Sequence, residues 1–147
     1  MRGRVFIQAC LLLIILSASE LTTLSREVQS GDYGPEVKAY LDFLRHEEAE
    51  LEFQIRNDEI PRKNYVRAKN RIAILRQKVL AIVKETGKDI VPELSVVTLS
   101  EIDQLIEDGS RLVRRAKPGT VLAEKWLYHG SVSRGEIFHV FERITKK

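Results

Sequence analysis

The sequence contains a single cysteine, Cys10, which lies inside an apolar stretch near the N-terminus. One thiol cannot form an intramolecular disulfide, so stability has to come from side-chain packing. The H-E-x-x-H, G-x-S-x-G and glycine-rich phosphate-binding motifs are also missing. These absences disfavour disulfide-stabilised folds and the common metalloprotease, hydrolase and nucleotide-binding classes. We therefore expect no cofactor and no metal.

The first 19 residues have the three parts of a secretory signal. Arg2 and Arg4 are followed by an apolar run from Val5 to Leu16 and then by the small residues 17–19. The run is 12 residues long, short of the roughly 20 that a spanning helix needs. We predict a signal peptide over 1–19, cleaved before Glu20, and a secreted or periplasmic protein. The alternative is a retained anchor that holds the protein on a membrane.

Cleavage would change the charge and remove the thiol. The full chain has 24 basic and 21 acidic residues, and the first 19 contain two of the bases and no acid, which leaves 22 against 21. A net charge of +1 gives little reason to expect nucleic acid as a partner. Residues 20–34 are polar and aperiodic, so we predict a flexible tether there and a single domain over 35–147.

Two helices are predicted to form a hairpin over 36–86, with the chain reversing near Pro61. The first helix, 36–58, is acidic, and the second, 61–86, is basic. Residues 36–59 contain eight acids and three bases, whereas residues 60–84 contain eight bases and no acid. This charge complementarity favours antiparallel packing of the two helices on each other.

The apolar positions of the two helices predict a shared interface and a second layer. Leu44 and Leu51 fall on one stripe of the first helix and are expected to face Ile72, Leu75 or their neighbours. The apolar face of the second helix is broader than that stripe can cover, so the C-terminal third is expected to pack on it.

Phe43 and Phe53 lie off the inward stripe of the first helix. Either another part of the chain covers these rings, or they form an exposed aromatic face for a partner or for self-association. They are the candidate binding residues.

The C-terminal unit, 92–144, is predicted to contain an extended segment at 94–97, a short helix at 102–106 and a β-hairpin. The hairpin strands would be 121–132 and 136–143, with Gly135 in a bulged turn. The fold class is therefore α+β, a long antiparallel helical hairpin packed against this unit. The alternative is an all-α protein with a C-terminal helix over 134–146, because Ser133 and Glu136 also have capping-box spacing.

A polar cluster at 128–139 is the only stretch that resembles a chemical site. On a hairpin, His129 and His139 would be near cross-strand neighbours, close to Arg134. Two imidazoles could share a metal or a proton, but no third ligand is evident. The preferred interpretation is that these histidines are either surface residues or internally hydrogen-bonded ones.

The basic helix 61–84 offers a further alternative, contact with an anionic surface. Its acidic neighbour is expected to neutralise most of that charge. The leading hypothesis is an exported, non-enzymatic interaction or structural module whose partner is a protein or a second copy of the chain. The alternatives are an extracytoplasmic enzyme or metal site at 128–139 and anionic-surface binding by helix 61–84.

Overall fold

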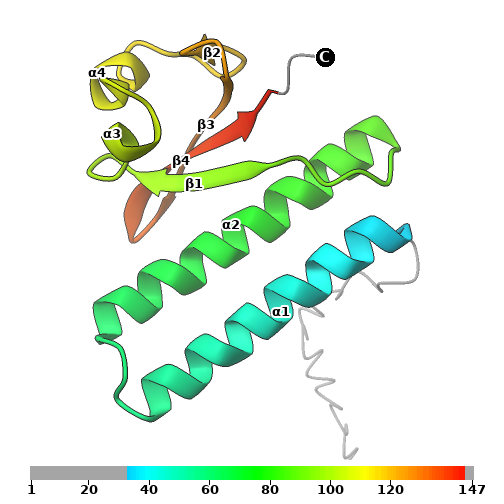
Figure 1. Ribbon diagram of the computed structural model, residues 1–147, viewed down its shortest axis with the longest axis vertical. Helices are drawn as coiled ribbons and strands as arrows, with labels where there is room; N and C mark the ends of the chain where they lie inside the picture. The colour runs from blue at the N-terminus through cyan, green and yellow to red at the C-terminus, as the bar shows by residue number, and fades with distance from the viewer. Residues whose placement is uncertain (1–32, 145–147) are drawn as a thin grey trace, which may run out of the picture.

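The computed structural model describes residues 33–144. Two long helices, α1 (Pro35–Arg56) and α2 (Arg62–Thr86), run antiparallel to each other (Figure 1). Pro35 opens α1, where its missing N–H costs nothing, and Gly87 ends α2 in the left-handed region at φ 67°. The predicted helical hairpin is confirmed, with each helix ending within a few residues of its expected bounds.

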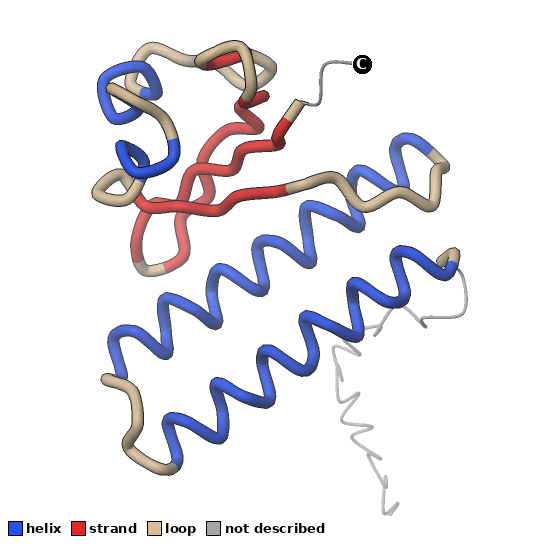
Figure 2. Tube along the Cα trace, in the orientation of Figure 1, coloured by secondary structure: helices blue, strands red, loops and turns tan. Residues whose placement is uncertain are grey.

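A four-stranded antiparallel sheet follows the hairpin. Its strands are β1 (Leu94–Thr98), β2 (Val121–Leu122), β3 (Trp126–Arg134) and β4 (Glu136–Arg143), in the order β1-β4-β3-β2. Two short helices, α3 (Ile102–Leu105) and α4 (Gly109–Val113), connect β1 to β2. The helical hairpin and this mixed unit together make an α+β fold (Figure 2).

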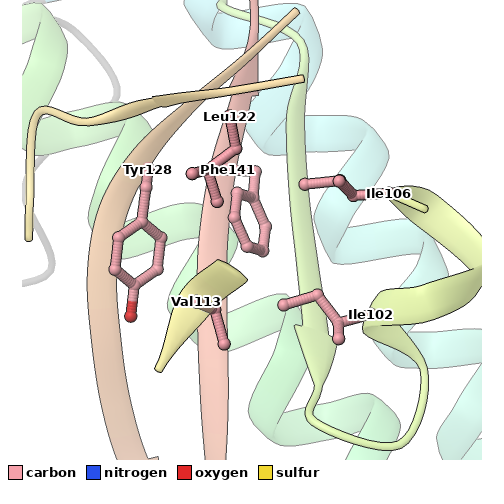
Figure 3. Close-up of a cluster of buried hydrophobic side chains, with 6 residues drawn as sticks. All are labelled: Ile102, Ile106, Val113, Leu122, Tyr128 and Phe141. Atoms are coloured by element: carbon pink, nitrogen blue, oxygen red, sulfur yellow. The ribbon is translucent and has the colours of Figure 1, made fainter. Parts of the chain in front are cut away.

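The sheet has an apolar core on each face because its side chains alternate between the two sides. Phe138 and Val140 of β4 pack with Ile74 of α2 and Val96 of β1. The opposite face is covered by α3 and α4, and Figure 3 shows that cluster. Its buried members are Ile102, Ile106, Val113, Leu122, Tyr128 and Phe141. The C-terminal unit therefore covers the broad face of α2, as predicted.

Helix α1 is the outermost layer, and α2 lies between it and the sheet (Figure 1). Val37 and Leu44 are its two buried residues. Ion pairs add to this apolar contact: Glu52 accepts a hydrogen bond from Lys69 at 2.6 Å, and Glu48 accepts one from Arg76 at 3.0 Å. The predicted pairing of an acidic with a basic helix is thus present.

The predicted β-hairpin is confirmed, because residues 136–143 are a strand paired antiparallel with β3, and this excludes the alternative of a helix over 134–146. One expectation for the C-terminal region is wrong. The predicted strand 121–132 is interrupted, because Ala123 and Glu124 adopt positive φ values of 46° and 57° and turn the chain between β2 and β3. Neither residue type signals such a turn, since glycine or asparagine usually occupies these positions.

The signal peptide over 1–19, with Cys10, and most of the tether over 20–34 lie outside the described residues. Within 33–144, no helix combines the length and apolar character that a membrane crossing requires.

Candidate functional site

The outer face of α1 carries the two aromatic residues that the sequence singles out. Phe43 is 53% exposed and Phe53 is 50% exposed. At 100° per residue, Phe53 lies about 160–180° around α1 from the buried Val37 and Leu44, and Phe43 lies about 100–120° from them, so neither falls on the buried stripe. Within the described chain, the interpretation that another segment covers these rings is not met.

The ring of Phe43 is supported from one side by Tyr40, with the ring centroids 6.3 Å apart. Burial raises the pKa of the Tyr40 hydroxyl above its ordinary value. Phe43 therefore stands beside a partly buried aromatic neighbour while about half of its own surface stays in water. An exposed aromatic surface on a regular helix is typical of a contact face.

The polar cluster at 128–139 separates into two unconnected pairs. His139 lies opposite Ser131, in the register set by the turn at Gly135, and His129 occupies the irregularity between Tyr128 and Gly130. His139 Nδ1 is 3.0 Å from the Tyr128 hydroxyl, and His129 Nε2 is 2.7 Å from Glu142 Oε2. The two histidines, expected as near cross-strand neighbours, are not paired with each other, and each contacts a different residue.

The electrostatics of His139 are those of a packed side chain. Burial lowers the pKa of its imidazole below 6.5 and raises the pKa of the Tyr128 hydroxyl. Within residues 33–144, no group of three or more histidine, cysteine or acidic side chains is placed to hold a metal ion. Arg134 lies at the hairpin tip, and its carbonyl oxygen accepts a hydrogen bond from Asn70 Nδ2 at 2.9 Å. The geometry thus gives these residues structural partners.

Half of the eight bases of α2 form ion pairs inside the molecule: Arg67, Lys69, Arg71 and Arg76. Arg67 makes a two-point contact with Glu136, at 2.7 Å from Nε to Oε1 and 2.9 Å from Nη2 to Oε2. That contact lowers the pKa of the Glu136 carboxyl, although partial burial of the group acts to raise it. Arg71 donates to Glu101 at 2.7 Å. The second helix therefore uses its charges to hold both α1 and the C-terminal unit.

A groove of about 450 Å³ remains at the N-terminal end of α2, beside the β3–β4 turn. Arg62, Lys63 and Arg134 line it and make no ion pair in the part of the chain that is described. Val66, also in its lining, is 44% exposed. By its helical spacing from Ala73 and Leu80, Val66 belongs to the broad apolar face of α2. No local signal distinguishes it from its buried neighbours, because the site depends on where the hairpin tip docks.

Comparison of the chain with protein-family models, with curated protein sequences and with solved structures gives no match.

Proposed function

We propose that the protein is an exported, non-enzymatic interaction module that presents the outer face of α1 to a protein partner. The observation that carries this proposal is the half-exposure of Phe43 and Phe53 on the outermost layer of the fold. Burial of an aromatic side chain is worth a few kcal/mol (about 1.5–3 each). Two such rings on a helix that already has its own packed seam provide free energy for an intermolecular contact.

The rest of the fold supports this role by holding α1 in place. The ion pairs of Glu48 and Glu52 with α2, and the packing of Val37 and Leu44, fix which side of α1 faces outward. A partner would therefore meet a preorganised surface, which lowers the entropic cost of association.

The experiment that tests the proposal separates binding from folding. The double substitution Phe43→Ser with Phe53→Ser should leave the thermal midpoint nearly unchanged, because both rings are half in water already. Leu44→Ser, on the buried side of the same helix, should lower it strongly and serves as the control for loss of fold.

Binding is read by photo-crosslinking of the full chain in the cells that produce it. A p-benzoylphenylalanine in place of Phe43 should give a covalent adduct, and the same group in place of exposed Gln77 on α2 should not. Mass spectrometry of the adduct identifies the partner. A chain that gives no adduct at position 43, or a double serine variant that unfolds, would overturn the proposal.

Export is the part of this proposal that rests on residues 1–19. A mature N-terminus near Glu20, found by mass spectrometry of the native protein, would support a secreted or periplasmic location. Retention of residues 1–19 would instead favour the membrane-anchored alternative.

A second candidate function is contact with an anionic surface through the groove at the start of α2. Arg62, Lys63 and Arg134, which make no ion pair among residues 33–144, border it together with the exposed Val66. Vesicles with and without anionic lipid test this directly. Arg62→Glu with Lys63→Glu should abolish any selective binding, whereas Lys125→Glu with Lys88→Glu, a matched change at other exposed positions, should not.

A further inference from the structure

The outer face of α1 has a regular pattern beyond its two phenylalanines. Positions 39, 43, 46, 50 and 53 alternate spacings of four and three and are all exposed. At 100° per residue they fall within an arc of about 80°. We call this set the outer stripe: Ala39, Phe43, His46, Glu50 and Phe53. Alternation of three and four is the spacing of a coiled-coil seam.

We propose that the outer stripe pairs with the same stripe of a second copy of this chain, with the two α1 helices antiparallel. This inference deepens the proposed function, on which it rests, by naming the partner. The carrying observation is that the stripe is complementary to its own reversed copy.

The pairing follows from a twofold axis at the level of Glu48. Antiparallel seams place each core position opposite one from the other half of the partner helix. Here Phe43 meets the partner's Phe53, and His46 meets the partner's Glu50. The axis repeats both contacts, so aromatic faces aromatic twice and imidazole faces carboxylate twice. A parallel pairing would instead set Glu50 against its own copy.

Hydrogen bonds within α1 orient His46 and Glu50 for the proposed pairing. The Nδ1–H of His46 donates to the Asp42 carbonyl at 2.8 Å, so in the protonated imidazole the Nε2–H is free to donate to a carboxylate. Glu50 Oε1 accepts a hydrogen bond from Gln54 at 3.0 Å, which leaves Oε2 available. Both side chains are thus oriented by their own helix before any partner arrives.

Charged side chains on one flank of the stripe also favour the antiparallel orientation, whereas those on the other flank oppose association. Antiparallel packing brings Asp42 near the partner's Arg56, a pair of opposite charges, although Asp42 also has Arg45 at 3.1 Å within its own helix. On the other flank Glu47 meets its own copy, which is repulsive. With a helix of 22 residues and half-exposed rings, we expect a weak dimer.

Disulfide trapping tests the geometry. In the full chain carrying Cys10→Ser, His46→Cys and Glu50→Cys copies with different tags are co-expressed and oxidised. The antiparallel stripe predicts a mixed His46→Cys to Glu50→Cys disulfide, because opposed core positions lie within reach of a bridge. Ala49→Cys should bridge to its own copy across the axis. Gln77→Cys, exposed on α2, should give no bridge.

Charge exchange tests the chemistry, with the Ala49→Cys bridge as the readout. His46→Glu and Glu50→Lys alone should each reduce the bridged fraction several-fold. Together they should restore it, because the new Glu meets the new Lys of the other copy. Gln77→Glu and Glu85→Lys are the matched controls and should change nothing. Glu47→Gln should increase the bridged fraction.

The outcomes are decisive and separable. Bridging of His46→Cys to itself in preference to Glu50→Cys, or failure of the double charge variant to recover, overturns antiparallel self-pairing. If the photo-crosslink at position 43 captures only a different protein and Ala49→Cys does not bridge, the interaction module stands and self-pairing is wrong. If position 43 captures nothing, the proposed function itself fails.

Discussion

Asp89 caps the backbone of Glu36 across 53 residues of sequence, and the Glu36 carboxylate in turn accepts a hydrogen bond from the segment that carries Asp89. The Asp89 carboxylate accepts the N–H groups of Glu36 and Val37, both at 3.0 Å, and Glu36 Oε1 accepts the N–H of Val91 at 3.0 Å. These hydrogen bonds resemble those of a capping box, in which the two residues are usually three positions apart in sequence. The start of α1 is therefore stabilised by the segment that follows α2.

Gly34 makes this contact possible. A Cβ at that position would overlap the carboxyl group of Asp89. We therefore predict that Gly34→Ala displaces Asp89 and costs about 1–2 kcal/mol, the usual value of a helix cap. Asp89→Ala should cost a similar amount.

A double-mutant cycle in chemical denaturation checks the coupling. Gly34→Ala combined with Asp89→Ala should be no less stable than Asp89→Ala alone, because the side chain that clashes is gone. Additive losses would show that Gly34 acts independently of Asp89.

The sheet has a buried core on each face, so we predict that removing a core side chain beneath either face strongly destabilises the fold. Ile74 is 2% exposed beneath one face and Ile102 is fully buried beneath the other. Replacement of either by alanine should cost about 2–4 kcal/mol. Val66→Ala, at a half-exposed position of α2, should cost less than about 0.5 kcal/mol. Urea unfolding measures all three, and a small effect at Ile74 would mean that α2 does not bury that side chain against the sheet.

His139 predicts a loss of stability on mild acidification. Burial lowers its pKa in the folded state below the ordinary 6.5. The unfolded chain then binds a proton at a higher pH than the folded chain does. Stability should fall as pH decreases through 6.5 and level off below the folded pKa. His139→Gln should remove that part of the pH dependence, seen by comparing unfolding free energies at pH 7.5 and 5.5. An unchanged slope would show that His139 titrates normally.

Glu101 predicts a separate effect at lower pH. Burial opposes its charge, but hydrogen bonds from Thr98 and Arg71 outweigh that cost and lower the pKa of the carboxyl. Its stabilising contribution is therefore complete above the ordinary value of 4.5 and is lost as pH falls through the folded pKa.

The measurement is the slope of unfolding free energy against pH between about 6 and 3. Glu101→Gln should flatten it. The exposed Glu107→Gln is the matched control and should leave the slope nearly unchanged. Equal slopes for the wild type and Glu101→Gln would contradict the assignment.

The sequence was enough to predict the helical hairpin and its layers. Pro61 and Gly87 mark the two ends of the apolar repeat of the second helix, and the two helices carry opposite charge. The position of Gly135 in a turn, at φ 72°, was likewise readable. These features are set by residues close together in sequence.

Other features depend on contacts between distant residues. The turn at Ala123 and Glu124 uses residue types that rarely adopt positive φ, and the displaced register at His129 arises from sheet pairing. The sequence left open whether Phe43 and Phe53 are exposed or covered. The apolar pattern of a single helix does not show which other segments pack against its remaining faces. The spacing of His46 and Glu50 was present in the sequence, but its meaning depends on α1 being the outermost layer.

The placement of α1 has a mechanical consequence. Its first residues are held by Asp89 at the same end of the hairpin where the chain leaves α2. Tension applied at Tyr33, with the sheet held at Ile144, would reach this clamp first. Neither apolar cluster of the sheet contains a residue of α1. Such a load would therefore peel α1 away turn by turn toward the loop at 57–61, while the sheet and its two cores remained folded.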